Sequence, residues 1–223
     1  MTSASTGSTG KTAERMKDWV AWHADYDDPT SALSQRRREV TRLIGECLDA
    51  RTGGTIRVLS LCAGDARDLA DALRDRVDAT PVSGAVVELD RALASRAVEN
   101  LRSVGAAVDV LCGDAGHTAV FADRLPVDLL LLVGVFGNVS DDDVERTIRA
   151  VPALCAPGAT VIWTRHRREP DLTLRIPAWF EAAGCEATAF VSLGPGTFAI
   201  GGERLAAHGA AAALPEQLFQ FTD

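Results

Sequence analysis

Three acidic residues stand directly after short apolar runs, where strands of a parallel sheet would end. Asp65 follows "VLSLCAG", Glu88 ends "GAVVE", and Asp114 lies in "LCGDAG". A carboxylate can accept hydrogen bonds from both hydroxyls of a ribose or from the amino group of a purine. The turn at 62–66 has a single glycine and, with Asp68 close behind it, two carboxylates. Such a turn favours a nucleoside that carries a positive charge over a pyrophosphate.

A basic stretch, "RHRR" at 165–168, follows a fifth apolar run. His166 titrates near neutral pH and is the natural candidate for a general base. Arg165 and Arg167 can each grip a carboxylate with two parallel hydrogen bonds. The stretch therefore predicts a binding site for a small anionic substrate. The alternative is a solvated loop whose charges are neutralised by the acidic residues just after it.

The elements that must position these residues alternate between strand and helix. Apolar runs predict strands at 56–61, 85–89, 108–111, 127–133 and 160–163, and helices are expected to begin near Asp65, Arg91, Ser140 and Asp171. This alternation predicts a doubly wound α/β fold with a parallel sheet covered on both faces, whose ligands bind at the carboxyl ends of the strands. The runs at 185–192 and 198–205, joined by "LGPGT", predict a final antiparallel pair.

Composition limits the classes of function. The chain has 223 residues, is 47% hydrophobic and carries a formal net charge of -8, which disfavours a nucleic-acid binder. No apolar stretch approaches the roughly 20 residues that span a bilayer, so no membrane partner is expected. The five scattered cysteines and the helix-capping "DDD" at 141–143 predict no metal site. With no secretion signal at the N-terminus, we expect a cytoplasmic monomer or homodimer with a disordered segment at 1–10.

A nucleoside with a positive charge and no phosphate describes S-adenosylmethionine. In order, the motifs "VLSLCAGDARD", "VVELD", "CGDAG", "VDLLLLVGVFGNVSDDD" and "LCAPGATVIW" resemble those of class I S-adenosylmethionine-dependent methyltransferases over residues 55–205. Together with "WHADYDDPTSALSQRR" and "WTRHRREPDLT", they are similar to a group of actinobacterial methyltransferase-like proteins. The resemblance implies a Rossmann-like, seven-stranded sheet with an antiparallel last strand and methyl transfer to a small molecule.

The resemblance also assigns roles to residues of this chain. The expected cofactor-binding residues are Ala63, Gly64, Asp65, Asp68, Glu88, Leu89, Asp114, Ala115, Gly134 and Tyr26. The expected acceptor site comprises Arg165, Arg167, Phe136, Asn138 and His23, with His166 as the catalytic residue. Three positions depart from the family's first motif, which has an acidic residue at position 60 and glycines at positions 62 and 66. Ser60, Cys62 and Ala66 stand there instead, and Ala66 would be strained if the turn requires a positive φ.

Residues 11–223 are expected to form a single domain in which helices within 11–50 act as a lid over the cofactor. Arg36 and Arg37 on the second of these helices could reach the ligand. Two other readings remain open: a nucleoside-binding or partner-binding protein without catalysis, and an enzyme that retains S-adenosylmethionine but does not methylate. An NAD-dependent oxidoreductase is disfavoured, because "CAGDAR" lacks the glycines that let a pyrophosphate approach the backbone.

Overall fold

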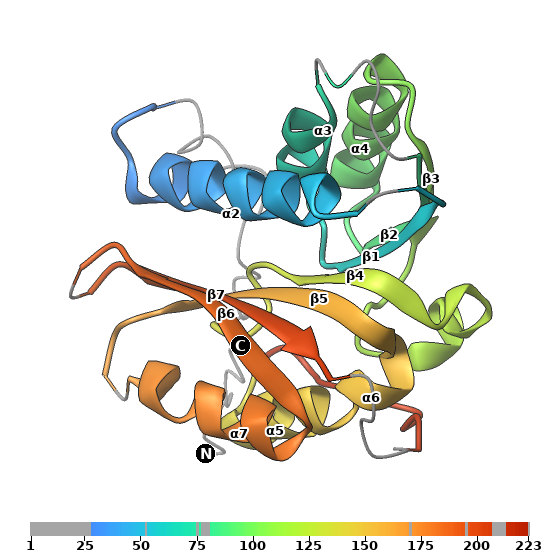
Figure 1. Cartoon of the computed structure of the whole chain (residues 1–223). Helices are drawn as coiled ribbons and strands as arrows, with labels where there is room; N and C mark the ends of the chain where they lie inside the picture. Colours follow the sequence, from blue (N-terminus) through green and yellow to red (C-terminus); the bar gives the residue numbers. More distant parts are fainter. Residues whose placement is uncertain are drawn as a thin grey trace, which may run out of the picture.

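The computed structural model describes residues 28–51, 53–74, 76, 81–169, 171–194, 196–206 and 213–222. These residues form three layers, with a seven-stranded sheet between two sets of helices (Figure 1). Its strands are β1 (Ile56–Leu61), β2 (Val82–Glu88), β3 (Ala107–Cys112), β4 (Val127–Leu132), β5 (Cys155–His166), β6 (Cys185–Ser192) and β7 (Phe198–Leu205). The strand order is β3-β2-β1-β4-β5-β7-β6. Strands β1 to β5 pair in parallel, and β7 lies antiparallel between β5 and β6. The predicted Rossmann-like sheet with an antiparallel last strand is confirmed.

The helices cover both faces of the sheet (Figure 1). One face carries α2 (Ala32–Asp49), α3 (Arg67–Leu73) and α4 (Arg91–Ser103), and the other carries α5 (Asp141–Arg149), α6 (Val151–Leu154) and α7 (Ile176–Ala182). The side chains of Ser31, Asp90 and Ser140 accept hydrogen bonds from the first turns of α2, α4 and α5. These caps satisfy backbone donors that have no partner inside the helix, and so they set where each helix begins.

Strand β5 begins earlier than its sequence predicts. The sequence predicts a strand only at 160–163, yet β5 also includes "APG" at 156–158, and its first residue Cys155 pairs with Val127 of β4. The register between β4 and β5 shifts between Val127 and Leu129. A register shift of this kind accommodates a proline and a glycine, which a regular central ladder would exclude.

The core lies on both faces of β4, whose six residues are all buried. On one face, α2 contributes Val40, Leu43, Ile44 and Leu48 to a cluster with apolar residues of β1, β4, β5 and β7. This packing makes α2, the second half of the expected lid, part of the layer that covers the sheet. The first half of the expected lid, with Tyr26 and His23, lies outside the described residues. No helix in the described part of the chain is long and apolar enough to cross a membrane.

The segment 213–222 packs against loops at the carboxyl edge of the sheet. The backbone N–H of Leu218 donates to the carbonyl of Gly116 at 2.8 Å, and that of Thr222 donates to the carbonyl of Asn138 at 2.8 Å. Leu218 and Phe219 are buried. A Cβ on Gly116 would lie 2.2 Å from the carbonyl oxygen of Phe219, so only glycine permits this approach. The segment therefore joins the loops that follow β3 and β4.

Candidate functional site

The turn after β1 adopts left-handed backbone conformations at three alternate residues. Cys62, Gly64 and Ala66 have φ angles of 57°, 58° and 53°. Glycine adopts this conformation without strain, whereas a residue with a Cβ pays about 1–2 kcal/mol. The positions that carry glycine in the resembled motif thus require its backbone here as well, and this chain accepts strain at two of them.

Glu88, at the end of β2, holds this turn in place. One of its carboxylate oxygens accepts the N–H of Gly64 at 2.7 Å, and the other accepts the N–H of Asp90 at 2.8 Å. The side chain is only 8% exposed. Each carboxylate oxygen can accept a further hydrogen bond, so Glu88 retains capacity for two hydroxyl groups while fixing two loops.

Asp114, the third of the acidic residues, lies near the turn that Glu88 holds. Asp114 follows β3, and its Oδ1 accepts the N–H of Gly116 at 2.8 Å. Its Oδ2 lies 3.7 Å from Nε2 of His117. Burial raises the pKa of the Cys62 thiol well above its usual value, and the negative charges of Glu88 and Asp114 raise it further. The ends of β1, β2 and β3 therefore converge, and Cys62 is an un-ionised, half-buried thiol between them.

Three further expected cofactor residues surround this point. Leu89 is 68% exposed, which leaves an apolar surface directly after Glu88, whereas Ala115 is buried. Gly134, after β4, has a φ of 81° and open space where a Cβ would stand. Its N–H donates to Oγ1 of Thr164 at 2.9 Å, and its carbonyl accepts from Nδ2 of Asn138 at 2.7 Å. Thr164, which the sequence did not single out, thus fixes the loop after β4.

The side chains of Asp65 and Asp68, the two aspartates of the first motif, have partners other than those of Glu88. Asp65 is buried and binds the guanidinium of Arg67. Asp68 accepts the N–H of Leu69 at 2.8 Å, and burial raises its pKa, with the charge of Arg36 on α2 opposing that shift. Asp68 therefore belongs to the contact between α2 and α3.

Two of the expected acceptor residues, Phe136 and Arg165, have buried side chains. Phe136 is fully buried and packs on Trp163 with ring centroids 6.3 Å apart, so its side chain belongs to the core. The guanidinium of Arg165 is buried too, where it donates to the carbonyl of Phe136 and lies 3.7 Å from Asp141. Burial also lowers the pKa of Arg165. Arg165 thus ties the end of β5 to the loop after β4.

Arg167 has two partners on the same side of the molecule. It donates to Oδ2 of Asp171 at 3.0 Å and to Oγ of Ser192 at 2.7 Å. Asp171 also accepts from the N–H and the hydroxyl of Thr173. This neutralised arrangement matches the alternative reading of "RHRR", in which acidic neighbours pair with its cations.

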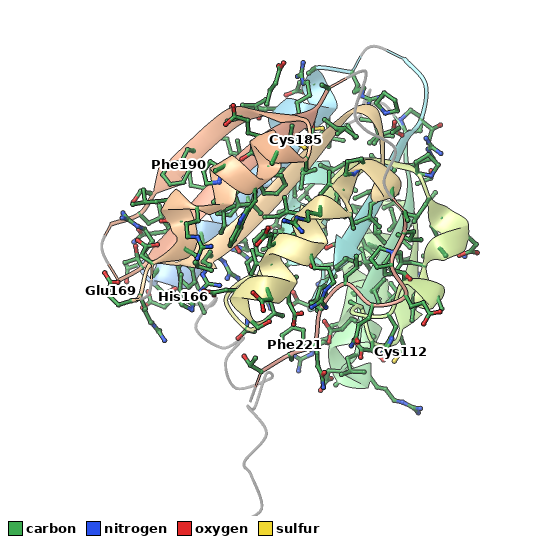
Figure 2. The ribbon with its side chains drawn as sticks, turned by 90° about the horizontal axis from the view of Figure 1, so that it is seen from below. Cys112, His166, Glu169, Cys185, Phe190 and Phe221 are labelled. Carbon is green, nitrogen blue, oxygen red and sulfur yellow. The ribbon has the colours of Figure 1, made fainter. Side chains whose placement is uncertain are left out.

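His166 is the last residue of β5. It therefore lies at the same carboxyl edge of the sheet as Cys112, the last residue of β3. Figure 2 shows His166, Phe221 and Cys112 along this one edge of the molecule. Burial lowers the pKa of His166 below its usual value, and the charges of Arg165 and Arg168 lower it further. Its Nδ1 accepts the N–H of Arg168 at 3.3 Å. His166 is therefore a neutral imidazole at neutral pH.

Sequence reasoning missed the segment 213–222 at this edge. Phe221 is 37% exposed and meets Phe219 edge-on, with centroids 5.9 Å apart. The hydroxyl of Thr222 donates to the carbonyl of Asn138 at 3.2 Å. The apolar residues of "LFQF", after an alanine-rich stretch, could have predicted this contact, because large apolar side chains are usually buried against the rest of a fold.

Comparison with known proteins rests on the fold. No protein-family model matches the sequence, and no curated protein matches it either. An O-methyltransferase family protein from Burkholderia thailandensis has a similar structure, with a TM-score of 0.62 and 16% identity over 85% of this chain and 61% of that one. This chain thus spans less than two thirds of the length of that protein.

Two further solved structures show the same likeness. The CurJ carbon methyltransferase has a TM-score of 0.60 and 13% identity over 83% of this chain and 58% of its own. The cyclase SpnF has a TM-score of 0.59 and 17% identity over 81% of this chain and 86% of its own. At these identities the likeness shows a shared fold, the one found in class I methyltransferases.

Proposed function

We propose that this protein binds S-adenosylmethionine at the carboxyl ends of β1, β2 and β3 and transfers its methyl group to a small molecule. The observation that carries the proposal is the contact between Glu88 and the N–H of Gly64. It places a buried carboxylate with spare acceptor capacity beside a turn built on left-handed residues. The fold of the solved methyltransferases adds support, because their ligands are expected at the same edge of the sheet.

The residues present fit this cofactor by the chemistry of their groups. Glu88 would accept hydrogen bonds from the two ribose hydroxyls, and the exposed Leu89 would offer an apolar surface to the base. Asp114 would accept from the amino group of adenine. The open space beside Gly134 would leave room for the methionine part of the molecule. A pyrophosphate fits poorly, because it would lie next to the Glu88 and Asp114 carboxylates.

When bound, S-adenosylmethionine supplies an electrophilic methyl group on a charged sulfur. The role of the chain would be to align the acceptor with that methyl group and to exclude water, since alignment alone can supply much of the rate. His166 would take the acceptor's proton through Nδ1, which requires its present bond from Arg168 to open. Its lowered pKa keeps that nitrogen unprotonated near neutral pH.

A second candidate is an enzyme that keeps the adenosyl ligand and catalyses a different reaction. The likeness to SpnF, described as a cyclase, favours this candidate because it extends over 86% of that protein. The two candidates share the cofactor site and differ at the acceptor. Mass spectrometry of a converted substrate separates them, since only methyl transfer adds the mass of a methyl group.

Isothermal titration calorimetry with S-adenosylhomocysteine and with NADH tests the cofactor proposal. We expect saturable 1:1 binding of S-adenosylhomocysteine and none of NADH. Tight binding of NADH, with no heat from S-adenosylhomocysteine, would sink the proposal and favour a dinucleotide enzyme.

A further inference from the structure

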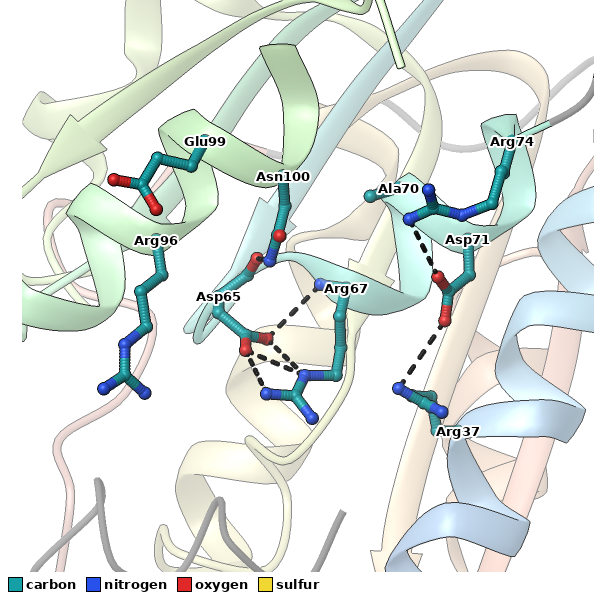
Figure 3. Close-up of a pocket in the computed structure, with 9 residues that line it drawn as sticks. All are labelled: Arg37, Asp65, Arg67, Ala70, Asp71, Arg74, Arg96, Glu99 and Asn100. Atoms are coloured by element: carbon teal, nitrogen blue, oxygen red, sulfur yellow. Dashed lines mark hydrogen bonds and ion pairs between the residues drawn. The ribbon is translucent and has the colours of Figure 1, made fainter. Parts of the chain in front are cut away.

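A pocket lies beside the turn that follows β1, and its lining includes Asp65 but not Glu88. It has a volume of about 340 Å³, is shared by α2, α3 and α4, and is lined by Arg37, Asp65, Arg67, Ala70, Asp71, Arg74, Arg96, Glu99 and Asn100 (Figure 3). This volume lies at the lower end of the range for small-molecule sites. Four arginines and three carboxylates give its lining a formal charge of +1, in a chain whose net charge is -8. A local excess of arginine is what a small anion needs to bind an acidic protein.

The carboxylates of the pocket do not satisfy all of its guanidinium groups. Asp71 is shared by Arg37, at 3.6 Å, and Arg74, at 3.5 Å. In the part of the chain that the structure describes, no carboxylate lies within ion-pair distance of Arg96, and Figure 3 shows no interaction drawn to it. Arg96 is exposed, so its charge is available to a ligand.

Arg67 and Arg96 lie on consecutive helices and extend into the pocket in the same direction (Figure 3). Arg67 binds Asp65, which is a monovalent carboxylate, while Arg96 has no such partner. A doubly charged oxyanion between the two guanidinium groups would gain charge-assisted, fork-shaped hydrogen bonds from both. Phosphate has this charge and geometry, whereas a single carboxylate has one negative charge to share between them.

We propose that this pocket binds a phosphate group, as the free ion or as a small phosphate monoester, between Arg67 and Arg96. The ligand shares Arg67 with Asp65, whose buried carboxylate keeps its ion pair, and it gives Arg96 an anionic partner. The site uses neither Glu88 nor Asp114, and it shares only Asp65 with the expected cofactor-binding residues.

Titration of the full chain with inorganic phosphate and, separately, with ribose 5-phosphate tests this proposal, by calorimetry at low ionic strength. Arg96→Gln should weaken binding about tenfold or more, because it removes a charged donor. Asp71→Asn should strengthen binding, because it removes a negative charge from the lining of the pocket. Arg102→Gln is the matched control, since Arg102 is exposed on the same helix outside the pocket.

The two probes separate the sources of the phosphate group. A preference for ribose 5-phosphate indicates a phosphorylated metabolite, and a preference for inorganic phosphate indicates the free ion. Absence of saturable binding of both probes by the folded protein overturns the proposal. Equal weakening by Arg96→Gln and Arg102→Gln also overturns it, because the attraction would then come from general charge. Circular dichroism of each variant verifies that it is folded.

Discussion

The carboxylate of Glu88 accepts the N–H of Gly64 at 2.7 Å, so the end of β2 holds the turn that follows β1. The second oxygen of the same carboxylate holds the N–H of Asp90, at the start of α4. The group that we assign to the cofactor ribose is thus also the group that fixes the geometry of its own site. Such a dual role pre-organises the site before the ligand arrives.

Glu88→Gln should weaken binding of S-adenosylhomocysteine by about 1–3 kcal/mol. Glutamine keeps one oxygen but points an N–H₂ group at one of two backbone donors, which leaves a buried group without an acceptor. Calorimetry of the variant measures the loss. Glu181→Gln, on the exposed face of α7, is the control and should bind as the wild type does. Unchanged affinity in Glu88→Gln would remove Glu88 from the cofactor site.

Ala66→Gly should stabilise the protein. Ala66 has a φ of 53°, and glycine removes about 1–2 kcal/mol of strain at the cost of about 0.4–1 kcal/mol in unfolded-chain entropy. We expect a net gain of roughly 0.5–1 kcal/mol by chemical denaturation. Ala70→Gly, in the helical backbone of α3, provides the contrast and should destabilise by about 1 kcal/mol. A loss of stability in both variants would contradict the strained turn.

The stability of the protein should fall as pH rises through about 7, because of Glu203. This carboxyl is buried, accepts the indole N–H of Trp163 at 3.1 Å, and has a pKa raised to about 7 by burial. The folded state holds the proton more tightly than the unfolded state, so the stabilisation is complete below about pH 4.5 and is lost through pH 7. Burial raises the pKa of Cys185 to about 12, with a further contribution from the charge of Glu203, so this thiol stays un-ionised throughout.

Glu203→Gln isolates this effect. Glutamine retains an oxygen for Trp163 but carries no charge, so the variant should gain on the order of 1–2 kcal/mol relative to wild type at pH 8.5. That gain should vanish at pH 4, below the unfolded pKa of the carboxyl. Thermal unfolding at both pH values measures it, and an equal difference at both would exclude titration of Glu203 as the cause.

Arg165 and Arg167 should differ in their effects on stability. Arg165→Ala leaves the carbonyl of Phe136 without its buried donor and should cost about 1–3 kcal/mol. Arg167→Ala breaks a more exposed ion pair with Asp171 and should cost about 0–1 kcal/mol. Urea denaturation ranks the two variants. Equal small losses of unfolding free energy would mean that the contact of Arg165 with the carbonyl of Phe136 does not stabilise the fold. Arg165 would then again be a candidate for binding the acceptor.

Periodicity and capping residues predicted most of the elements in the described chain. Strand β1 spans the predicted residues, and Ser140 caps α5 as expected. The start of β5 could not be predicted, because proline and glycine at 157 and 158 indicate a stop while pairing with β4 overrides them. Local sequence carries no information on that pairing.

The position of Asp65, Glu88 and Asp114 at strand ends was predictable because they follow apolar runs, and strand ends meet in a parallel sheet. The positive φ of Cys62 and Ala66 was not predictable from residue type, since neither residue favours it. The burial of Arg165 was not predictable either. The stretch "RHRR" has the composition of a surface loop, and only the long-range contact with the carbonyl of Phe136 accounts for its interior position.

The docking of residues 213–222 has a consequence for the order in which the site is assembled. The loops after β3 and β4 are synthesised well before this segment, yet they bond to its backbone at Gly116 and Asn138. A growing chain that has already folded its first four strands still lacks these bonds. The carboxyl edge of the sheet can therefore reach its final shape only late in synthesis, after residue 222 has been added.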